Sequence, residues 1–228
     1  MAMQTLYERA EVRIELRERC VVMSAEGPHA CVSYAPFGGA LRAARTVAIH
    51  ETRNDELTLD VDPIELLATR MSAVDPRGVG MWTSRRIASA VVIATEAAGE
   101  PETRAVALVT AGLSNAVRVG DTPGPLAGWG TINIACHLNV PLTASALIET
   151  LAVVVEARTA AVIDAGVRSR RSDGIATGTG TDCVAVLAGA TQGAIYAGKH
   201  TAIGHVIGDA VFRATEAAIA QWKLEVRT

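Results

Sequence analysis

The sequence predicts an α/β protein of the α+β type, a single domain over residues 1–228 in which a mixed or antiparallel sheet is covered by long packed helices. Half of the 228 residues are hydrophobic, which is enough to build one core of this size. The chain opens with strand-like alternation instead of a βαβ pattern. Two long apolar stretches, 143–166 and 201–223, predict helices that need a sheet or a second subunit to cover them, so we also expect a homo-oligomer, most simply a homodimer.

The first fifty residues predict a meander of short strands. Residues 11–17 (EVRIELR) carry an apolar side chain at every second position, which is typical of a half-solvated antiparallel strand. Residues 20–24 and 30–34 are interpreted as two further strands, joined by a turn at Glu26-Gly27-Pro28. The second half of residues 40–49 is also interpreted as a strand.

Capping residues mark the predicted helices. Residues 62–74 have an acidic N-cap and a proline at the first helical position, and Pro76 and Gly78 follow the end of the helix. The long helix at 143–166 begins with Thr143 as its N-cap. Further strands are predicted at 78–83, 87–95, 105–110, 131–138 and 183–188, with loops at 96–103, 111–130 and 168–181.

Composition narrows the classes of function. The formal net charge is −3, so the sequence lacks the basic surface by which proteins bind the nucleic-acid backbone. Neither a secretory signal nor an uninterrupted apolar span of membrane length is found, which predicts a cytoplasmic protein without a membrane partner. The four cysteines show no CxxC pair, so we expect reduced, mostly packed thiols.

Two long glycine-rich loops are the first candidates for a binding site. The loop TAGLSNAVRVGD contains Ser114, Asn115 and Asp121, although a capped turn leading into a short strand would explain it equally. The stretch TGTGTD, residues 177–182, exposes hydroxyls and backbone N–H groups that suit an anionic or amide-rich ligand. It is neither a P-loop nor a dinucleotide-binding loop, because a strand follows it where those motifs require a helix.

Asp182 stands where this loop enters an apolar strand. Its carboxylate could act as a general base or orient a nucleophile, and the alternative is a structural acid satisfied by backbone donors. If the strand is regular, Cys183 should point to the opposite face, so that only one of the two side chains reaches the site.

The segment AGKHTAIGHVIG places Lys199, His200 and Thr201 at the start of a helix. His200 is a candidate proton donor or acceptor, although a single histidine is more often structural. His205 lies five residues further on, which is the wrong spacing for two helical zinc ligands, so no metal site is expected.

Other polar residues are open to two interpretations. His50 and His137 end apolar runs and are either functional or buried in the core. Arg168, Arg170 and Arg171 could grip a carboxylate or phosphate, or could form a solvated basic run.

With these segments identified, the chain resembles the CbiZ family, the adenosylcobinamide amidohydrolases. The matching stretches occur in order along nearly the whole chain: SYAPFGGALRAARTV (33–47), VGMWTS (79–84), VTAGLSNAVRVGD (109–121), GTINI (130–134), VPLTASALIETLAVVVEARTAAVIDAGV (140–167), SRRSDGIATGTGTD (169–182) and YAGKHTAIGHVIGDAV (196–211). The combination of TAGLSNA, GIATGTGTD and YAGxHTxxG is specific, whereas any one of them alone would be weak.

The resemblance implies hydrolysis of the amide that joins aminopropanol to the corrin ring of adenosylcobinamide, a step of cobamide salvage that gives adenosylcobyric acid. The cobalt-containing corrinoid would be the substrate, and no cofactor is expected. Two alternatives stay open: an amidase acting on another cofactor-like substrate, and a non-catalytic protein that binds a corrinoid or another small molecule.

On this basis we assign hypothetical roles to residues. The attacker is Ser114 or a water activated by Asp182, and His200 carries the proton. Asn115 and the N–H groups of 178–181 stabilise the oxyanion. The expected substrate-binding residues are Gly38, Gly39, Asn115, Asp121, Thr177, Gly178, Thr179, Gly180, Thr181, Lys199 and Thr201.

The chain departs from the usual family pattern at several positions. Its glycine run at 38–39 is shorter, and Cys136-His137 replaces an apolar pair. Lys199 stands where a small or polar residue is commoner, and Arg171 and Asp173 alter the loop before TGTGTD.

Overall fold

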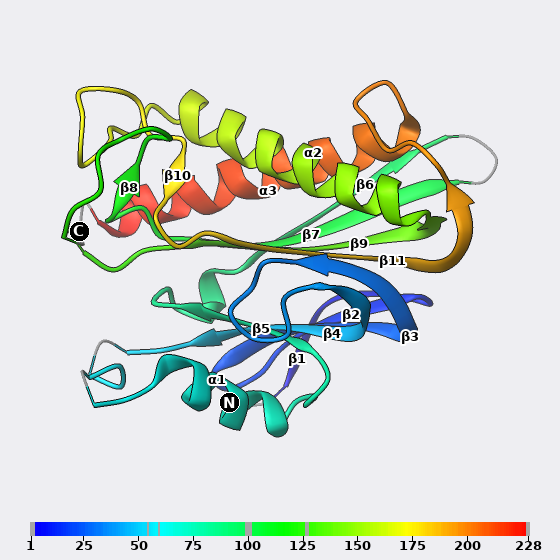
Figure 1. Ribbon diagram of the computed structural model, residues 1–228, viewed down its shortest axis with the longest axis horizontal. Coiled ribbons are helices and arrows are strands. Elements are labelled where there is room, and N and C mark those ends of the chain that lie inside the picture. The colour runs from blue at the N-terminus through cyan, green and yellow to red at the C-terminus, as the bar shows by residue number, and fades with distance from the viewer. Residues whose placement is uncertain (1–2, 54, 59, 99–101, 126–127, 227–228) are drawn as a thin grey trace.

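The computed structural model describes residues 3–53, 55–58, 60–98, 102–125 and 128–226. In Figure 1, a large mixed sheet folds into two halves that pack against each other, with helices on the outer side of each half. The elements are β1 (Gln4–Arg9), β2 (Val12–Leu16), β3 (Cys20–Ser33), β4 (Leu41–Glu51), α1 (Pro63–Ser72), β5 (Val79–Thr83), the 3-10 turn η1 (Ile87–Ser89), β6 (Val91–Ala97), β7 (Thr103–Ala111), β8 (Ala116–Val117), β9 (Ile132–Leu142), α2 (Ala144–Asp164), β10 (Gly178–Thr179), β11 (Cys183–Ala194) and α3 (Ala202–Glu225).

The long strand β3 joins the two halves of the sheet. Its first part pairs with β2 and its last part with β11, while β4 runs along its other edge. The prediction of two strands separated by a turn at Glu26-Gly27-Pro28 was therefore wrong. Between Ser24 and His29 the register with β4 shifts, so these residues form a bulge within one strand. A bulge tolerates Pro28, which cannot donate a backbone hydrogen bond.

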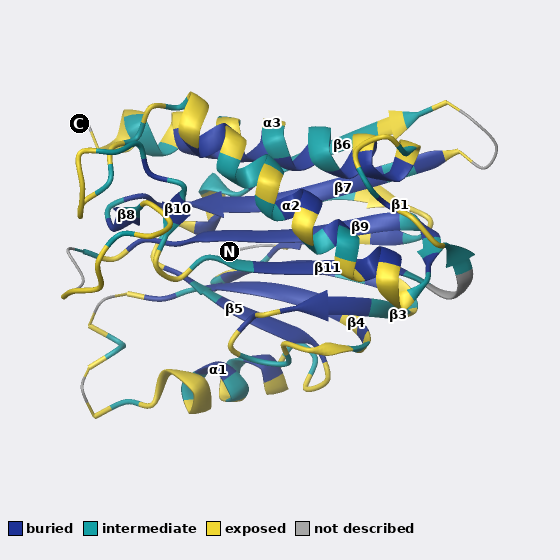
Figure 2. Cartoon of the chain, turned by 45° about the horizontal axis from the view of Figure 1, so that its top comes forward, coloured by how far each residue is buried: buried dark blue, intermediate teal, exposed yellow. Residues whose placement is uncertain are grey.

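The central strands β7, β9 and β11 are buried on both faces. Ile134 and Cys136 of β9 pack toward α2 and α3, whereas Ala135, the residue between them, packs toward the β1–β5 half. Figure 2 shows these strands in the colour of buried residues, with exposed positions gathered on the outer sides of the helices. Burial on both faces explains why the strands are apolar at nearly every position.

The topology confirms a mixed sheet with long packed helices. β9 and β11 are parallel and are connected through α2, and β4 and β5 are parallel and are connected through α1. All other pairs in the large sheet are antiparallel. Helix α1 covers the outer face of the β1–β5 half with Leu67 and Met71.

The predicted helices are confirmed with their caps. Asp62 accepts hydrogen bonds from the N–H groups of Ile64 and Glu65, and Thr143 accepts one from that of Ala146. Among the described residues, no helix has the length and apolarity needed to cross a membrane.

Several boundaries differ from the prediction. The whole of residues 41–51 is strand, and the strand predicted at 87–95 begins only at Val91, after η1. Strand β1 was not predicted. Two of the predicted loops contain the short strands β8 and β10, and residues 99–101 and 126–127 of the loops at 96–103 and 111–130 lie outside the described residues.

Candidate active site

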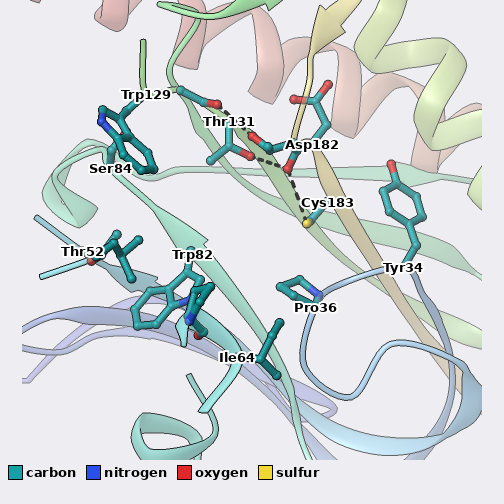
Figure 3. A pocket seen from close by; sticks show the side chains of 14 residues that line it. Tyr34, Pro36, Thr52, Ile64, Trp82, Ser84, Trp129, Thr131, Asp182 and Cys183 are labelled. Atoms are coloured by element: carbon teal, nitrogen blue, oxygen red, sulfur yellow. Dashed lines mark hydrogen bonds between the residues drawn. The ribbon is translucent and has the colours of Figure 1, made fainter. Parts of the chain in front are cut away.

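A cavity of about 420 Å³ opens between the two halves of the sheet, where β9 and β11 begin and β5 ends. We call it the aromatic cavity, because Tyr34, Trp82 and Trp129 lie in its wall together with Pro36 and Ile64 (Figure 3). Its polar lining comes mainly from the half of the sheet that contains β9 and β11. Those polar groups include Thr131, Thr181, Asp182 and Cys183, with Ser84 and Thr52 nearer β5 and β4.

The TGTGTD turn forms one side of this cavity and is held by Asp182. Oδ1 of Asp182 accepts hydrogen bonds from the backbone N–H of Ile132, at 2.9 Å, and from the hydroxyl of Thr179, at 2.5 Å. Oδ2 accepts from the backbone N–H of Thr179, at 2.9 Å, and is ion-paired with the Arg158 guanidinium of α2. Both oxygens therefore have two donors each, which fills the accepting capacity of a carboxylate.

Such a carboxylate fixes the turn, and the geometry favours this orienting role over that of a free base. The Arg158 and Asp182 side chains are only 12% and 6% exposed, so the ion pair is strongly shielded from water. The turn is further tied down because Thr131 donates its hydroxyl to the carbonyl of Thr181, and Thr181 donates its own to that of Gly130.

Asp182 and Cys183 both belong to the lining of the aromatic cavity, but their side chains point to opposite sides of the chain (Figure 3). The Asp182 carboxylate points to Arg158 of α2 and the Cys183 thiol points toward the cavity, as the alternation of side chains along a strand predicts. Burial raises the pKa of the Cys183 thiol to about 11, and it raises the pKa of the Tyr34 phenol to about 12. Both groups are therefore neutral at pH 7.

Trp82 is held rigidly in the cavity wall. Its indole N–H donates to the carbonyl of Pro63 at 3.0 Å, and the Arg70 guanidinium lies 4.9 Å from the ring centroid. His50 packs edge-on behind the ring, with 6.1 Å between centroids.

A second, smaller cavity of about 210 Å³ lies on the other side of the TGTGTD turn. We call it the arginine cavity, because Arg118, Arg170 and Arg171 line it together with Asn115 and Gly180. The two glycine-rich loops meet here: β8 of the first pairs with β10 of the second, with Val117 opposite Gly178 and Ala116 opposite Thr179.

Asp121 and Thr177 help to join these two loops. Asp121 lines the arginine cavity and accepts hydrogen bonds from the Arg118 N–H and the Ser169 hydroxyl. The pKa of the Asp121 carboxyl is lowered by hydrogen bonds from the hydroxyls of Ser169 and Ser172 and from the backbone N–H of Arg118. The Thr177 hydroxyl accepts a hydrogen bond from the N–H of Val119. Ser114 is partly buried beside Gly128, but it does not line either cavity among the residues described.

Lys199, His200 and Thr201 are not brought to these cavities. They precede α3, beyond the far end of β11, whereas Asp182 precedes its first residue (Figure 1). The regular residues 183–188 of that strand alone span about 17 Å. Lys199 is paired with Glu156, and Thr201 caps α3 by accepting from the N–H of Gly204 at 3.0 Å. His200 is exposed.

Gly38 and Gly39 lie outside the aromatic cavity, although Tyr34 and Pro36 of the same segment line it. Gly38 has a φ of +67°, and a side chain at Gly39 would collide with the backbone of Ala35. These glycines therefore shape the turn between β3 and β4.

His50 and His137 are buried in the core. His50 Nε2 lies 3.3 Å from the Met71 sulfur, and His137 Nε2 lies 3.2 Å from Nε2 of His29. Burial lowers the pKa of each of the two buried imidazoles to about 4. Within the described residues, no three His, Cys, Asp or Glu side chains are grouped closely enough to hold a metal ion.

Sequence reasoning missed the aromatic wall and Arg158. VGMWTS was recognised only as a matching stretch, and Trp129 was included in a loop without a role. The cue for Arg158 was the single basic residue of a mainly apolar helix, where a buried charge is expected to have a partner.

The comparisons with known proteins agree with the sequence motifs. The family model "CbiZ: Adenosylcobinamide amidohydrolase" matches residues 3–226. A protein of Methanocaldococcus jannaschii, "Uncharacterized protein MJ1613", is 34% identical over 142 residues, which cover 53% of this chain and 56% of that protein. The matched region thus spans about half the length of this relative.

The PH0078 protein from Pyrococcus horikoshii OT3 has a solved structure that aligns with 98% of this chain and 83% of its own, with a TM-score of 0.45 and 10% sequence identity.

Proposed function

The chain belongs to the CbiZ family of adenosylcobinamide amidohydrolases, and we propose that it hydrolyses the amide between the aminopropanol arm and the corrin ring of adenosylcobinamide. The products would be adenosylcobyric acid and an aminopropanol. The observation that carries this proposal is the family match, which extends over residues 3–226.

The aromatic cavity suits part of such a substrate. Its volume of about 420 Å³ is within the usual range for small-molecule sites, but it is too small for a whole corrinoid. We place the amide-bearing arm and one edge of the ring in the cavity, with the rest of the ring outside. Trp82 and Trp129 provide apolar surface on opposite sides, and the hydroxyls of Thr131 and Thr181 are suited to hydrogen bonding with the amides.

Hydrolysis of an unactivated amide needs an attacking group, donors for the developing oxyanion and a proton for the leaving amine. The hydroxyl and thiol groups that line the cavity, and a bound water, are the available attackers. Because Asp182 already accepts four hydrogen bonds, we assign it the positioning of the TGTGTD turn. The roles expected from the sequence each require a rearrangement. Ser114 does not line the aromatic cavity among the described residues, and Asp182 could activate a water only by giving up one of its four hydrogen bonds. His200 would have to reach the substrate from beyond the far end of β11.

Incubation with adenosylcobinamide tests the proposal directly. We expect chromatography to show equal amounts of adenosylcobyric acid and released aminopropanol, at a rate proportional to protein concentration. Heat-unfolded protein is the control. Intact substrate after prolonged incubation with folded protein would contradict the proposal.

A non-catalytic corrinoid-binding protein is the second candidate. It is favoured by the absence of histidine among the described residues that line the aromatic cavity, and by the filled accepting capacity of Asp182. An absorbance titration with adenosylcobinamide distinguishes the candidates when it accompanies the hydrolysis assay. Binding without release of aminopropanol would support this candidate, whereas neither binding nor release would indicate an amidase with another substrate.

A further inference from the structure

We propose that the arginine cavity is a binding site for a phosphoryl group carried by a small-molecule ligand. This inference goes beyond the proposed amide hydrolysis and does not depend on it. It rests on three arginines without ion pairs among the described residues, on the asparagine amide in the same lining, and on the glycines that make room for the guanidiniums.

The positive charge comes from Arg118, Arg170 and Arg171, which belong to two different loops and line the same cavity. In the part of the chain that the structure describes, none of these guanidiniums forms an ion pair with a carboxylate. The Arg118 guanidinium donates to the carbonyl of Ile175 at 2.9 Å, which uses only one of its five donors. The three arginines therefore offer many free donors to a ligand.

Asp121 is the acidic residue among the described residues that line the cavity, and its carboxylate is already hydrogen-bonded within the two loops. It accepts from the N–H of Arg118 at 2.8 Å and from the hydroxyl of Ser169. Three guanidiniums and one carboxylate leave an excess of positive charge in the cavity lining. The chain as a whole has a net charge of −3, so this concentration of positive charge is local and not a property of the entire surface.

Asn115 adds a hydrogen-bonding group to the lining of the arginine cavity. The residue is only 5% exposed. Its Oδ1 lies against Gly130 and, among the described residues, has no hydrogen-bond partner. The other end of the amide is an NH₂ group, which can donate to a phosphate oxygen while the remaining oxygens accept from arginine.

Two glycines allow the guanidiniums to occupy these positions. A side chain at Gly124 would collide with the guanidinium of Arg171, and one at Gly174 would come within 2.8 Å of Cδ of Arg118. Gly180 adds bare backbone to the wall, with open space where a side chain would stand. A ligand can therefore approach the main chain closely.

A phosphoryl group fits this lining better than a carboxylate does. One guanidinium already matches the two oxygens of a carboxylate, whereas three guanidiniums match the three or four oxygens of a phosphate. The volume of about 210 Å³ leaves room for such a group. The arginine cavity and the aromatic cavity are separated by the TGTGTD turn, so one ligand could place a phosphoryl group and an apolar group on its two sides.

A calorimetric titration with inorganic phosphate at constant ionic strength tests the site. We expect saturable binding at one site per chain, and about tenfold weaker binding in Arg171→Gln and Arg170→Gln. Arg168→Gln is the matched control, because Arg168 is exposed, lies two residues before Arg170 in the same loop and does not line the cavity among the residues described. This variant should keep the wild-type affinity. Asn115→Asp keeps the side chain nearly the same size but adds a negative charge. It should therefore weaken phosphate binding at least as much as Arg171→Gln does.

Melting temperatures of the ligand-free variants identify any that fail to fold, and acetate in place of phosphate measures the preference over a carboxylate. Equal weakening in Arg168→Gln and Arg171→Gln would show general attraction to positive charge and would overturn the proposal. It would also be overturned by absence of phosphate binding in the folded wild type, or by acetate binding as tightly as phosphate. Each of these results leaves the amide hydrolysis assay unaffected, so the two proposals can fail separately.

Discussion

Asp182 and Arg158 form the most shielded ion pair that the structure records, and the carboxylate also accepts three further hydrogen bonds. An asparagine at this position would leave Arg158 without its counter-charge and would turn an N–H donor toward groups that are themselves donors. Breaking a buried pair from one side commonly costs about 3 kcal/mol or more.

We therefore expect Asp182→Asn to lower the free energy of unfolding by about 3 kcal/mol, as measured by urea denaturation. Asp173→Asn in the neighbouring loop is the control, because Asp173 is exposed, and it should change the stability little. A wild-type unfolding midpoint for Asp182→Asn would show that the pair does not hold the turn.

His50 should make the stability depend on pH. The pKa of this imidazole is about 4 in the folded protein and about 6.5 in an unfolded chain. As the pH falls below 6.5, His50 binds a proton in the unfolded chain but not in the folded protein. The stability present at neutral pH is therefore lost between pH 6.5 and pH 4.

When the pH is lowered from 7.5 to 5.0, the free energy of unfolding of the wild type should fall by about 2 kcal/mol more than that of His50→Leu. Denaturation at both pH values measures this difference. His137 has a similarly lowered pKa but is present in both proteins, so its contribution cancels. His205→Leu, at an exposed position, controls for the removal of an imidazole elsewhere. Parallel pH profiles for wild type and His50→Leu would contradict this prediction.

At the scale of elements, Thr201 serves helix α3. Its hydroxyl accepts from the N–H of Gly204 at 3.0 Å and donates to the carbonyl of Gly198 at 2.8 Å. Thr201→Ala should therefore lower the free energy of unfolding by about 1 kcal/mol, whereas Thr201→Ser should keep most of it. Urea denaturation measures both. If Thr201→Ala instead kept full stability and weakened corrinoid binding, the residue would act on the ligand, as the sequence analysis expected.

The sequence predicted elements well where a local signal defines them. The predicted N-caps Asp62 and Thr143 and the predicted helix start near Thr201 are confirmed. That Thr201 is itself the N-cap of α3 was not predicted. The prediction failed where long-range pairing decides. β3 continues through Glu26-Gly27-Pro28 because β4 pairs with it on both sides of the bulge, and no local pattern reveals that partner.

For the whole molecule, the site was predicted in part. The loops TAGLSNAVRVGD and GIATGTGTD do meet, as β8 and β10. The segment that contains His200 does not join them, because β11 extends to Ala194 and carries the chain away before α3 begins. The aromatic wall could not be inferred, since it forms only when the two halves of the sheet pack together.

This packing gives a prediction for the whole molecule. Trp82 comes from one half of the sheet and Trp129 from the other, and both line the aromatic cavity. Trp129→Leu should weaken binding of adenosylcobyric acid, which lacks the aminopropanol arm and is not hydrolysed, by about tenfold in equilibrium dialysis. Trp222, the third tryptophan, belongs to α3 and does not line the cavity, so Trp222→Leu should leave affinity unchanged. Equal affinities for all three proteins would remove the aromatic cavity from the ligand site.

Three consecutive residues divide two recesses: Gly180 lines the arginine cavity, and Thr181 and Asp182 line the aromatic cavity. An insertion or deletion in this short partition would displace both recesses in a single event, so neither could be resized independently. Evolutionary diversification of ligand choice should consequently proceed by exchanging side chains around a partition of constant length.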